Sequence, residues 1–198
     1  MSKRYGLVID LEKCIGCETC WTACKAENGW GIGSGIRVDT VGGAHPDTPS
    51  GKYPNLSMYY LPVPCMHCGE PACVDACSFE AIYRREDGIV LVDEENCSGC
   101  EACIDACPYG ALTYDPERNV VRKCTLCHHR IDQGLEPFCV QCCTPKAIIF
   151  GDLNDPESKV SKLIAQKDTY VLKPEAGTNP AVHYVPVVHC SPVVSQRG

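Results

Sequence analysis

The chain has 198 residues, a formal net charge of −7 and 18 cysteines, a very large share for this length. No cluster of Lys and Arg with interleaved aromatic residues occurs, which argues against nucleic acid as a ligand, and no apolar run reaches the roughly 18 residues of a direct membrane span. The start, MSKRYGLVID, lacks a signal-peptide pattern. We therefore expect a cytoplasmic chain, or one exported only as a passenger on a signal-bearing partner.

The first predicted element is a strand in YGLVIDLEKC, which leads into a first group of four cysteines. The segment that follows, ENGWGIGSGIRVDTVGGAHPDTPSGKYPN (27–55), is rich in glycine and proline and has no periodicity, so it is predicted to be a loop. We interpret this loop as an arm that contacts a partner protein.

The second and third cysteine groups enclose AIYRREDGIVLVDEENC, which predicts two short strands joined at Asp87-Gly88. Short helices are predicted at 77–81 and 107–112, beyond the last cysteine of each group. The fourth group lies between predicted strands in VVRKC and AIIFGD. From Asp152 onward the chain is predicted to be an extended tail that packs on a partner.

Sixteen of the 18 cysteines fall into four groups that each begin with Cys-x-x-Cys. The first and third groups have the spacing two-two-three, whereas the second has two-four-three and the fourth two-eleven-three. The members, in chain order, are Cys14, Cys17, Cys20 and Cys24; Cys65, Cys68, Cys73 and Cys77; Cys97, Cys100, Cys103 and Cys107; and Cys124, Cys127, Cys139 and Cys143.

The two-two-three spacing is typical of bacterial ferredoxins, in which the fourth cysteine binds the other cluster of a pair. Structural zinc also uses Cys-x-x-Cys pairs, but zinc gives no reason for a third and a fourth cysteine at these spacings. Disulfides are disfavoured because closely spaced cysteines on a loop make poor bridging pairs. The sequence therefore predicts four 4Fe-4S clusters. Cys142 and the isolated Cys190 are interpreted as structural bystanders.

The separation of 32 residues between Cys65 and Cys97 is that of a small two-cluster ferredoxin, so groups two and three form one unit. Groups one and four then form a second unit, split by insertion of the first. The predicted fold is α+β, with two ferredoxin-like units, one inserted in the other, short strands and helices and long loops. The predicted boundaries are 1–64 with 109–151 for the outer unit, 65–108 for the inserted unit and 152–198 for the tail.

Crosswise ligation follows from this pairing, because the fourth cysteine of each group serves the neighbouring cluster. The predicted ligand sets are Cys14, Cys17, Cys20 with Cys143; Cys124, Cys127, Cys139 with Cys24; Cys65, Cys68, Cys73 with Cys107; and Cys97, Cys100, Cys103 with Cys77.

Charged residues near the groups are expected to tune the reduction potentials, because positive charge stabilises the reduced cluster. The fourth group is surrounded by Arg122, Lys123, His128, His129 and Arg130. The second and third groups are surrounded by Glu70, Asp75, Glu94, Glu95, Glu101 and Asp105. We therefore predict a higher potential for the cluster of the fourth group, the alternative being that these charges form a solvated face or a partner interface. Replacement of a thiolate by His67, His128 or His129 is disfavoured because each group is complete.

The pattern resembles the four-cluster iron-sulfur subunit of the dimethyl sulfoxide reductase family of molybdenum and tungsten enzymes, and covers residues 4–185. The tail segments FGDLNDPESKV and VLKPEAGTNPAVHY look most like the branch that acts on sulfur compounds. The residues that carry the resemblance are YGLVIDLEKCIGCETCWTACK, CMHCGEPACVDAC, REDGIVLVDEENCSGCEACIDACPYGA and RKCTLCHHRIDQGLEPFCVQCC.

The resemblance implies an electron-transfer subunit of an oxidoreductase complex in anaerobic metabolism, with no catalytic site of its own. It implies as partner a large catalytic subunit with a bis-pterin molybdenum or tungsten centre, nearest to the first-group cluster that Cys143 completes, and in some complexes a membrane anchor subunit. Two alternatives stay open, the iron-sulfur subunit of a hydrogenase or quinone-linked complex and a free polyferredoxin. The long segments without ligands argue against the last, because a diffusing carrier needs no docking surface.

Overall fold

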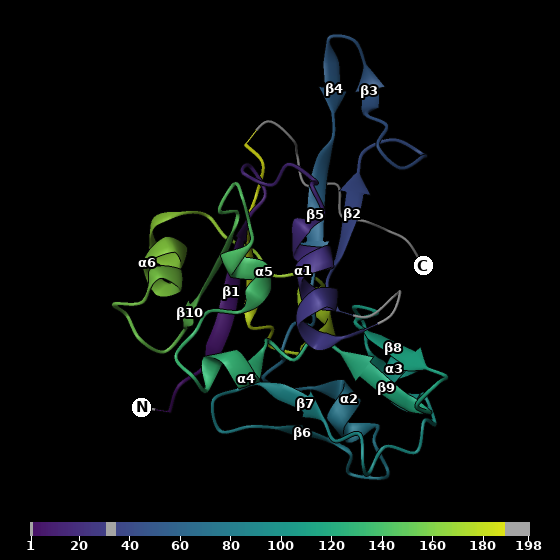
Figure 1. Cartoon of the computed structure of the whole chain (residues 1–198). Coiled ribbons are helices and arrows are strands. Elements are labelled where there is room, and N and C mark those ends of the chain that lie inside the picture. The colour runs from purple at the N-terminus through teal and green to yellow at the C-terminus, as the bar shows by residue number, and fades with distance from the viewer. Residues whose placement is uncertain (1, 31–34, 189–198) are drawn as a thin grey trace.

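The computed structural model describes residues 2–30 and 35–188. Its largest sheet has three strands and joins the beginning of the chain to its last third (Figure 1). Its middle strand is β1 (Tyr5–Asp10). Strand β10 (Ile148–Asp152) pairs with it antiparallel, and β11 (Val182–Val185) pairs with it parallel. The strands predicted before the first and after the fourth cysteine group are thus confirmed, and they are hydrogen-bonded to each other.

Both faces of β1 are covered, which explains why its sequence is apolar almost without interruption. Leu7 and Ile9 face the main core, whereas Val8 on the opposite face packs on Val160. Val160 belongs to helix α6 (Lys159–Gln166), which begins after Ser158, whose side chain accepts a hydrogen bond from the backbone N–H of Ser161.

Two β-hairpins form a smaller core of their own. The first joins β6 (Ile82–Arg84) to β7 (Val90–Val92) through the predicted Asp87-Gly88 turn, where Gly88 has φ of +84°. The second joins β8 (Leu112–Asp115) to β9 (Val120–Lys123). Their apolar side chains form one cluster, with Ile82, Val90, Cys103, Leu112 and Val121. The second hairpin, assigned to the outer unit from the sequence, therefore shares its apolar cluster with residues of 65–108.

The third cysteine of each group lies on a helix, and α1 carries the fourth cysteine of its group as well, so the position of the helices corrects the sequence prediction. The helices are α1 (Thr19–Asn28), α2 (Ala72–Asp75), α3 (Ala102–Ala106), α4 (His128–Ile131) and α5 (Phe138–Gln141), with a 3₁₀ turn, η1, at Pro174–Ala176. The helices predicted at 77–81 and 107–112 are wrong, since these residues form turns followed by strand. Helix α3 ends before Cys107, because Pro108 disfavours a helical conformation at the residue before it.

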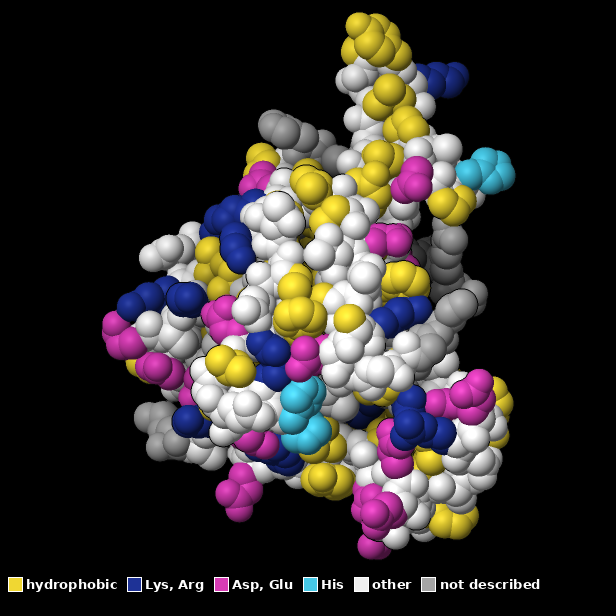
Figure 2. All heavy atoms as spheres, viewed as in Figure 1, with side chains coloured by type: hydrophobic (Ala, Val, Ile, Leu, Met, Phe, Trp, Pro, Cys, Tyr) yellow, Lys and Arg dark blue, Asp and Glu magenta, His cyan; other side chains and the backbone are white. Residues whose placement is uncertain are grey.

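The segment predicted as a loop contains strands, so that prediction is also wrong for its described residues. β2 (Arg37–Val41) pairs with β5 (Tyr59–Val63), and β3 (Ser50–Lys52) pairs with β4 (Asn55–Ser57). Together they form a hairpin that projects from the body of the chain (Figure 1). Figure 2 shows hydrophobic side chains along it, and Tyr53 at its tip is 89% exposed.

Residues 152–188 are not an extended tail. They contain α6, η1 and β11, and β11 completes the central sheet. Tyr184 of this strand is fully buried and its hydroxyl donates to the Pro62 carbonyl at 2.9 Å. This part of the chain therefore packs on its own body. Cys190 lies outside the described residues.

Candidate cluster-binding site

Each Cys-x-x-Cys pair lies on a tight loop whose residue before the second cysteine has a left-handed backbone. That residue is Gly16, His67, Gly99 or Leu126, with φ of +68°, +41°, +70° and +53°. Glycine adopts this conformation without steric cost, whereas His67 and Leu126 do so with strain. Such a loop turns successive N–H groups inward, an arrangement found around phosphates and iron-sulfur clusters.

The third and fourth cysteines of each group are four residues apart, close to one turn of a helix, and in the first group both lie on the same side of α1. In the first group, Cys20 and Cys24 are both buried on α1. In the fourth, Cys139 lies on α5 and Cys143 just beyond its end. A helix of this kind can present one thiol to each of two neighbouring sites.

The thiols assemble into four sets, which we name by one member each. In each set, burial and then the neighbouring thiols of the same set raise the pKa of at least one member. They are the Cys20 set (Cys14, Cys17, Cys20, Cys143), the Cys124 set (Cys24, Cys124, Cys127, Cys139), the Cys65 set (Cys65, Cys68, Cys73, Cys107) and the Cys103 set (Cys77, Cys97, Cys100, Cys103). Each set joins three cysteines of one group with the fourth cysteine of another.

Two of the sets each line one hollow. All four members of the Cys124 set line a hollow together with Leu7, Ile36 and Leu126. All four members of the Cys103 set line a second hollow together with Phe79 and Val121. Cys24, from the first group, thus faces the fourth group and not its own neighbours. That these sets bind clusters crosswise stays a prediction.

Two electrostatic interactions connect the sets to one another. The thiol of Cys20 perturbs the pKa of Cys139, and the thiol of Cys65 perturbs that of Cys124. The Cys124 set therefore lies between the Cys20 set and the Cys65 set. Cys17 and Cys100 are exposed, whereas every member of the Cys124 set is buried.

The chemistry of the thiols fits an iron-sulfur cluster. Burial, and then the neighbouring thiols, raise the pKa of Cys20 and Cys73 to about 12 and hold those of Cys124 and Cys139 well above the ordinary value. Thiols packed in this way ionise only if a cationic centre binds them as thiolates. Within the described ranges, no three His, Cys, Asp or Glu side chains form a site for a single metal ion.

Backbone N–H groups donate to the thiol sulfurs, as expected for cluster ligands. The N–H of Leu126 lies 3.4 Å from Cys124 Sγ, and that of Ala147 lies 3.2 Å from Cys143 Sγ. In the third group, the N–H of Val121 lies 3.4 Å from Cys97 Sγ. The residues present therefore fit 4Fe-4S clusters.

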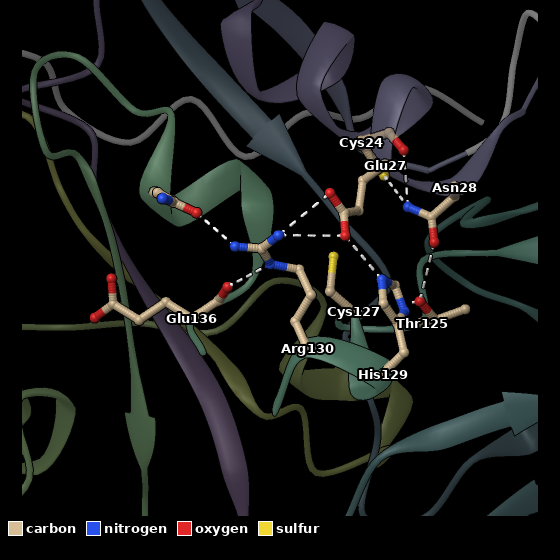
Figure 3. Close-up of polar contacts among 9 residues, drawn as sticks. Cys24, Glu27, Asn28, Thr125, Cys127, His129, Arg130 and Glu136 are labelled. Atoms are coloured by element: carbon tan, nitrogen blue, oxygen red, sulfur yellow. Dashed lines mark hydrogen bonds and ion pairs between the residues drawn. The ribbon is translucent and has the colours of Figure 1, made fainter. Parts of the chain in front are cut away.

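A polar contact beside the Cys124 set is not predicted by the sequence. Glu27 of α1 accepts from His129 at 2.9 Å and from Arg130 of α4 at 3.3 Å (Figure 3). The next residue, Asn28, donates to the Cys24 carbonyl at 2.8 Å. Because Glu27 and Arg130 are 103 residues apart, no local pattern could have indicated this contact.

The charges around the fourth group differ in their partners. Arg122 pairs with Glu94 and Asp115, and Arg130 and His129 pair with Glu27. Lys123 is 2% exposed and has no ion pair among the described residues. The Nδ1 atom of His67 is not available as a metal ligand, because it accepts a hydrogen bond from the backbone N–H of Val90 at 3.0 Å.

Cys142, between the two ligand positions at the end of α5, is half-buried and lines neither hollow. Across the part of the chain that the structure describes, no helix has the length and apolar character needed to cross a membrane.

Two protein families match the sequence. The family described as "4Fe-4S dicluster domain" matches residues 56–153, and that described as "4Fe-4S binding domain" matches residues 7–27.

Several known proteins are similar over most of the chain. A Halobacterium salinarum protein assigned as an iron-sulfur subunit of dimethyl sulfoxide reductase is 46% identical, over 92% of this chain and 79% of its own length. A subunit of the sulfite dehydrogenase of Allochromatium vinosum is 42% identical, over 92% and 83%. A subunit of the tetrathionate reductase of Salmonella typhimurium is 41% identical, over 92% and 72%.

Proposed function

Because this chain belongs to the family of iron-sulfur subunits of dimethyl sulfoxide reductase and its relatives, we propose that it relays electrons through four 4Fe-4S clusters. The electrons pass between a catalytic subunit with a molybdenum or tungsten pterin centre and an external or membrane electron carrier. The role in electron transfer is that of the family, whereas the number of clusters, their ligands and the partner's metal centre are our proposal.

One observation carries the proposal, namely the sorting of 16 cysteines into four sets that each combine two groups. A bound 4Fe-4S cluster accepts and releases single electrons. The polypeptide supplies the thiolates, donates N–H groups to their sulfurs and excludes water from the central sets. This arrangement supports the nested architecture, in which residues 65–108 are inserted between 1–64 and 109–151.

The electrostatic interactions between sets suggest the order of the four sets along the electron-transfer path. The thiol of Cys20 acts electrostatically on Cys139 of the Cys124 set, and that of Cys65 acts on Cys124. The Cys103 set adjoins the Cys65 set within the inserted unit. Both terminal sets have an exposed thiol, Cys17 and Cys100. We assign the Cys17 end to the catalytic subunit and the Cys100 end to the second electron carrier.

The projecting hairpin supports contact with the catalytic subunit. Tyr53 and Leu56 at its end are 89% and 51% exposed, and exposed apolar side chains of this size are characteristic of protein interfaces. A Tyr53→Ser, Leu56→Ser double variant should keep its iron and lose co-purification with the large subunit. Retention of the large subunit by this variant would exclude the hairpin from the interface.

The partner is tested by isolating the tagged chain from its native cells under anaerobic conditions. We expect a large subunit that contains molybdenum or tungsten, with or without a membrane anchor subunit. A nickel-containing partner would instead indicate a hydrogenase, and isolation alone would indicate a free polyferredoxin. The compartment is proposed to be the cytoplasm, or an exported location reached as a passenger on a signal-bearing catalytic subunit.

A further inference from the structure

Lys123 is a buried cation without a carboxylate partner in the described structure. It is the last residue of β9, directly before Cys124, and only 2% exposed. Its ammonium donates to the carbonyl of Val90 and, at 3.2 Å, to that of Cys124. Two neutral carbonyls do not balance a buried charge, and an uncompensated charge in a protein interior is costly. An anionic group is therefore needed nearby.

His67 also bonds to Val90, the residue of β7 whose carbonyl accepts from Lys123. Its Nδ1 accepts from the N–H of Val90 at 3.0 Å, so the proton of the neutral ring is on Nε2. The Nε2 atom is buried and has no hydrogen-bond partner among the described residues. A buried N–H normally has an acceptor, and the polypeptide supplies none here.

Both residues lie next to cysteines of two different sets, the Cys65 set and the Cys124 set, and we call the boundary between these sets the seam. His67 is in the loop between Cys65 and Cys68, and Lys123 precedes Cys124. The charge of Lys123 acts on the thiol of Cys73, across the seam from its own neighbour Cys124. The thiols of Cys65 and Cys124 also interact. Lys123, which lacks an anion, and His67, which lacks an acceptor, thus both bond to Val90 at this boundary.

We propose that Lys123 and His67 are positioning residues that stabilise the reduced state of the two clusters meeting at this seam, those of the Cys65 and Cys124 sets. Lys123 supplies the counter-charge, and the Nε2–H of His67 donates a hydrogen bond to a cluster sulfur. Positive charge and hydrogen bonds to sulfur both raise the reduction potential of an iron-sulfur cluster. The electron thus crosses between the two units at a step whose potentials these residues set.

This inference rests on the proposed clusters, and the experiment separates the two. The full-length chain is purified anaerobically, its iron is counted, and its clusters are titrated by electron paramagnetic resonance, with signals assigned through Cys73→Ala and Cys124→Ala variants. If the wild-type chain holds no clusters, the proposed function fails. If it holds them, the following variants test the seam.

Lys123→Met removes the charge and keeps most of the volume. We expect more negative midpoint potentials for the clusters of the Cys65 and Cys124 sets and unchanged potentials for the other two. Lys123→Arg should restore most of the loss, and Lys146→Met, an exposed lysine three residues after Cys143, should change neither. Unchanged potentials in Lys123→Met, or an equal shift at all four clusters as in a loosened fold, would overturn the role of Lys123.

His67→Gln keeps an acceptor for the N–H of Val90. In the wild-type chain exchanged into D₂O, we expect a deuteron coupled to the electron spin of the cluster that His67 contacts, and loss of this coupling in His67→Gln. Persistence of the coupling would overturn the role of His67, because a water molecule or another N–H would then be its source. These two results test the role of His67 whether or not Lys123→Met assembles its clusters, and the potentials of Lys123→Arg then test the role of Lys123.

Discussion

Glu27 and Arg130 form an ion pair that joins α1 to α4, with Arg130 Nη1 3.3 Å from Glu27 Oε1, beside the thiols of Cys24 and Cys127 (Figure 3). Both side chains are largely buried, at 17% and 16% exposed, and His129 adds a second donor to the same carboxylate. These hydrogen bonds hold the pKa of Glu27 below its ordinary value. The contact connects the first and the fourth cysteine groups of the sequence at one thiol set.

Replacement of Glu27 by Gln should weaken this connection, because Arg130 then lacks its anion. We expect a loss of about 1–3 kcal/mol in the free energy of unfolding, as for a partly buried hydrogen bond to a charged group. Thermal unfolding and the rate of iron release to a chelator measure it. The matched control is Glu157→Gln, which breaks an exposed pair with Lys162 and should have little effect. Equal behaviour of the two variants would show that the Glu27 contact is not structural.

Crosswise ligation predicts which substitutions remove the same cluster. Cys24→Ala and Cys124→Ala should abolish or convert the same electron paramagnetic resonance signal, because both thiols line one hollow. Cys24→Ala and Cys14→Ala should affect different signals, although these cysteines are only ten residues apart. Cys142→Ala is the control and should retain all signals. Loss of one shared signal in Cys24→Ala and Cys14→Ala would contradict the crosswise arrangement.

Gly35 is required for the position of Cys24. Its φ is +97°, and a Cβ added there would lie 2.6 Å from Cys24 Sγ. We expect Gly35→Ala to lower stability by about 1–3 kcal/mol and to alter the signal of the cluster in the Cys124 set. Gly134→Ala is the matched control, since Gly134 has φ of +77° but no atom within 4 Å of the added Cβ. If both variants keep an unaltered cluster signal, close approach at Gly35 is unimportant.

His183 gives the central sheet a dependence on pH. It lies on β11, opposite Val8 of β1, and burial, with the charge of Arg4, lowers its pKa. The unfolded chain therefore takes up a proton at this residue more readily than the folded chain, and the stabilisation by neutral His183 is lost as the pH falls below about 6.5. His183→Gln should show a smaller decrease in melting temperature than wild type between about pH 8 and pH 5.5. An identical decrease in both proteins would contradict this account.

The sequence predicts the elements whose signals are local. The strand at 5–10 is apolar up to its last residue, Asp10, and the hairpin at Asp87-Gly88 has a specific turn signal. The cysteine spacing likewise indicates which thiols belong together without knowledge of any contact. In contrast, the four-residue interval between Cys20 and Cys24 indicates only ligand spacing in the sequence, although it is also the period of the helix that carries both.

The remaining features depend on residues far apart in the chain. β2 is recognisable only through its pairing with β5, in which Arg37 lies opposite Val63, and its glycine-rich surroundings indicated a loop. β11 joins the sheet beside β1, with Leu7 opposite Val182. The sequence also does not show that Lys123 lacks a carboxylate partner. Arg122 and Arg130, two other cations of the fourth group, have carboxylate partners that become apparent only in the structure.

The central claim is that the thiol sets bind four 4Fe-4S clusters, and metal analysis of the anaerobically purified full-length chain tests it most directly. Iron and acid-labile sulfide are measured together with zinc in the same sample. The account predicts about sixteen iron atoms and about sixteen sulfides per chain, four of each for every 4Fe-4S cluster. Stoichiometric zinc without acid-labile sulfide, or iron sufficient for only one or two clusters, would contradict it.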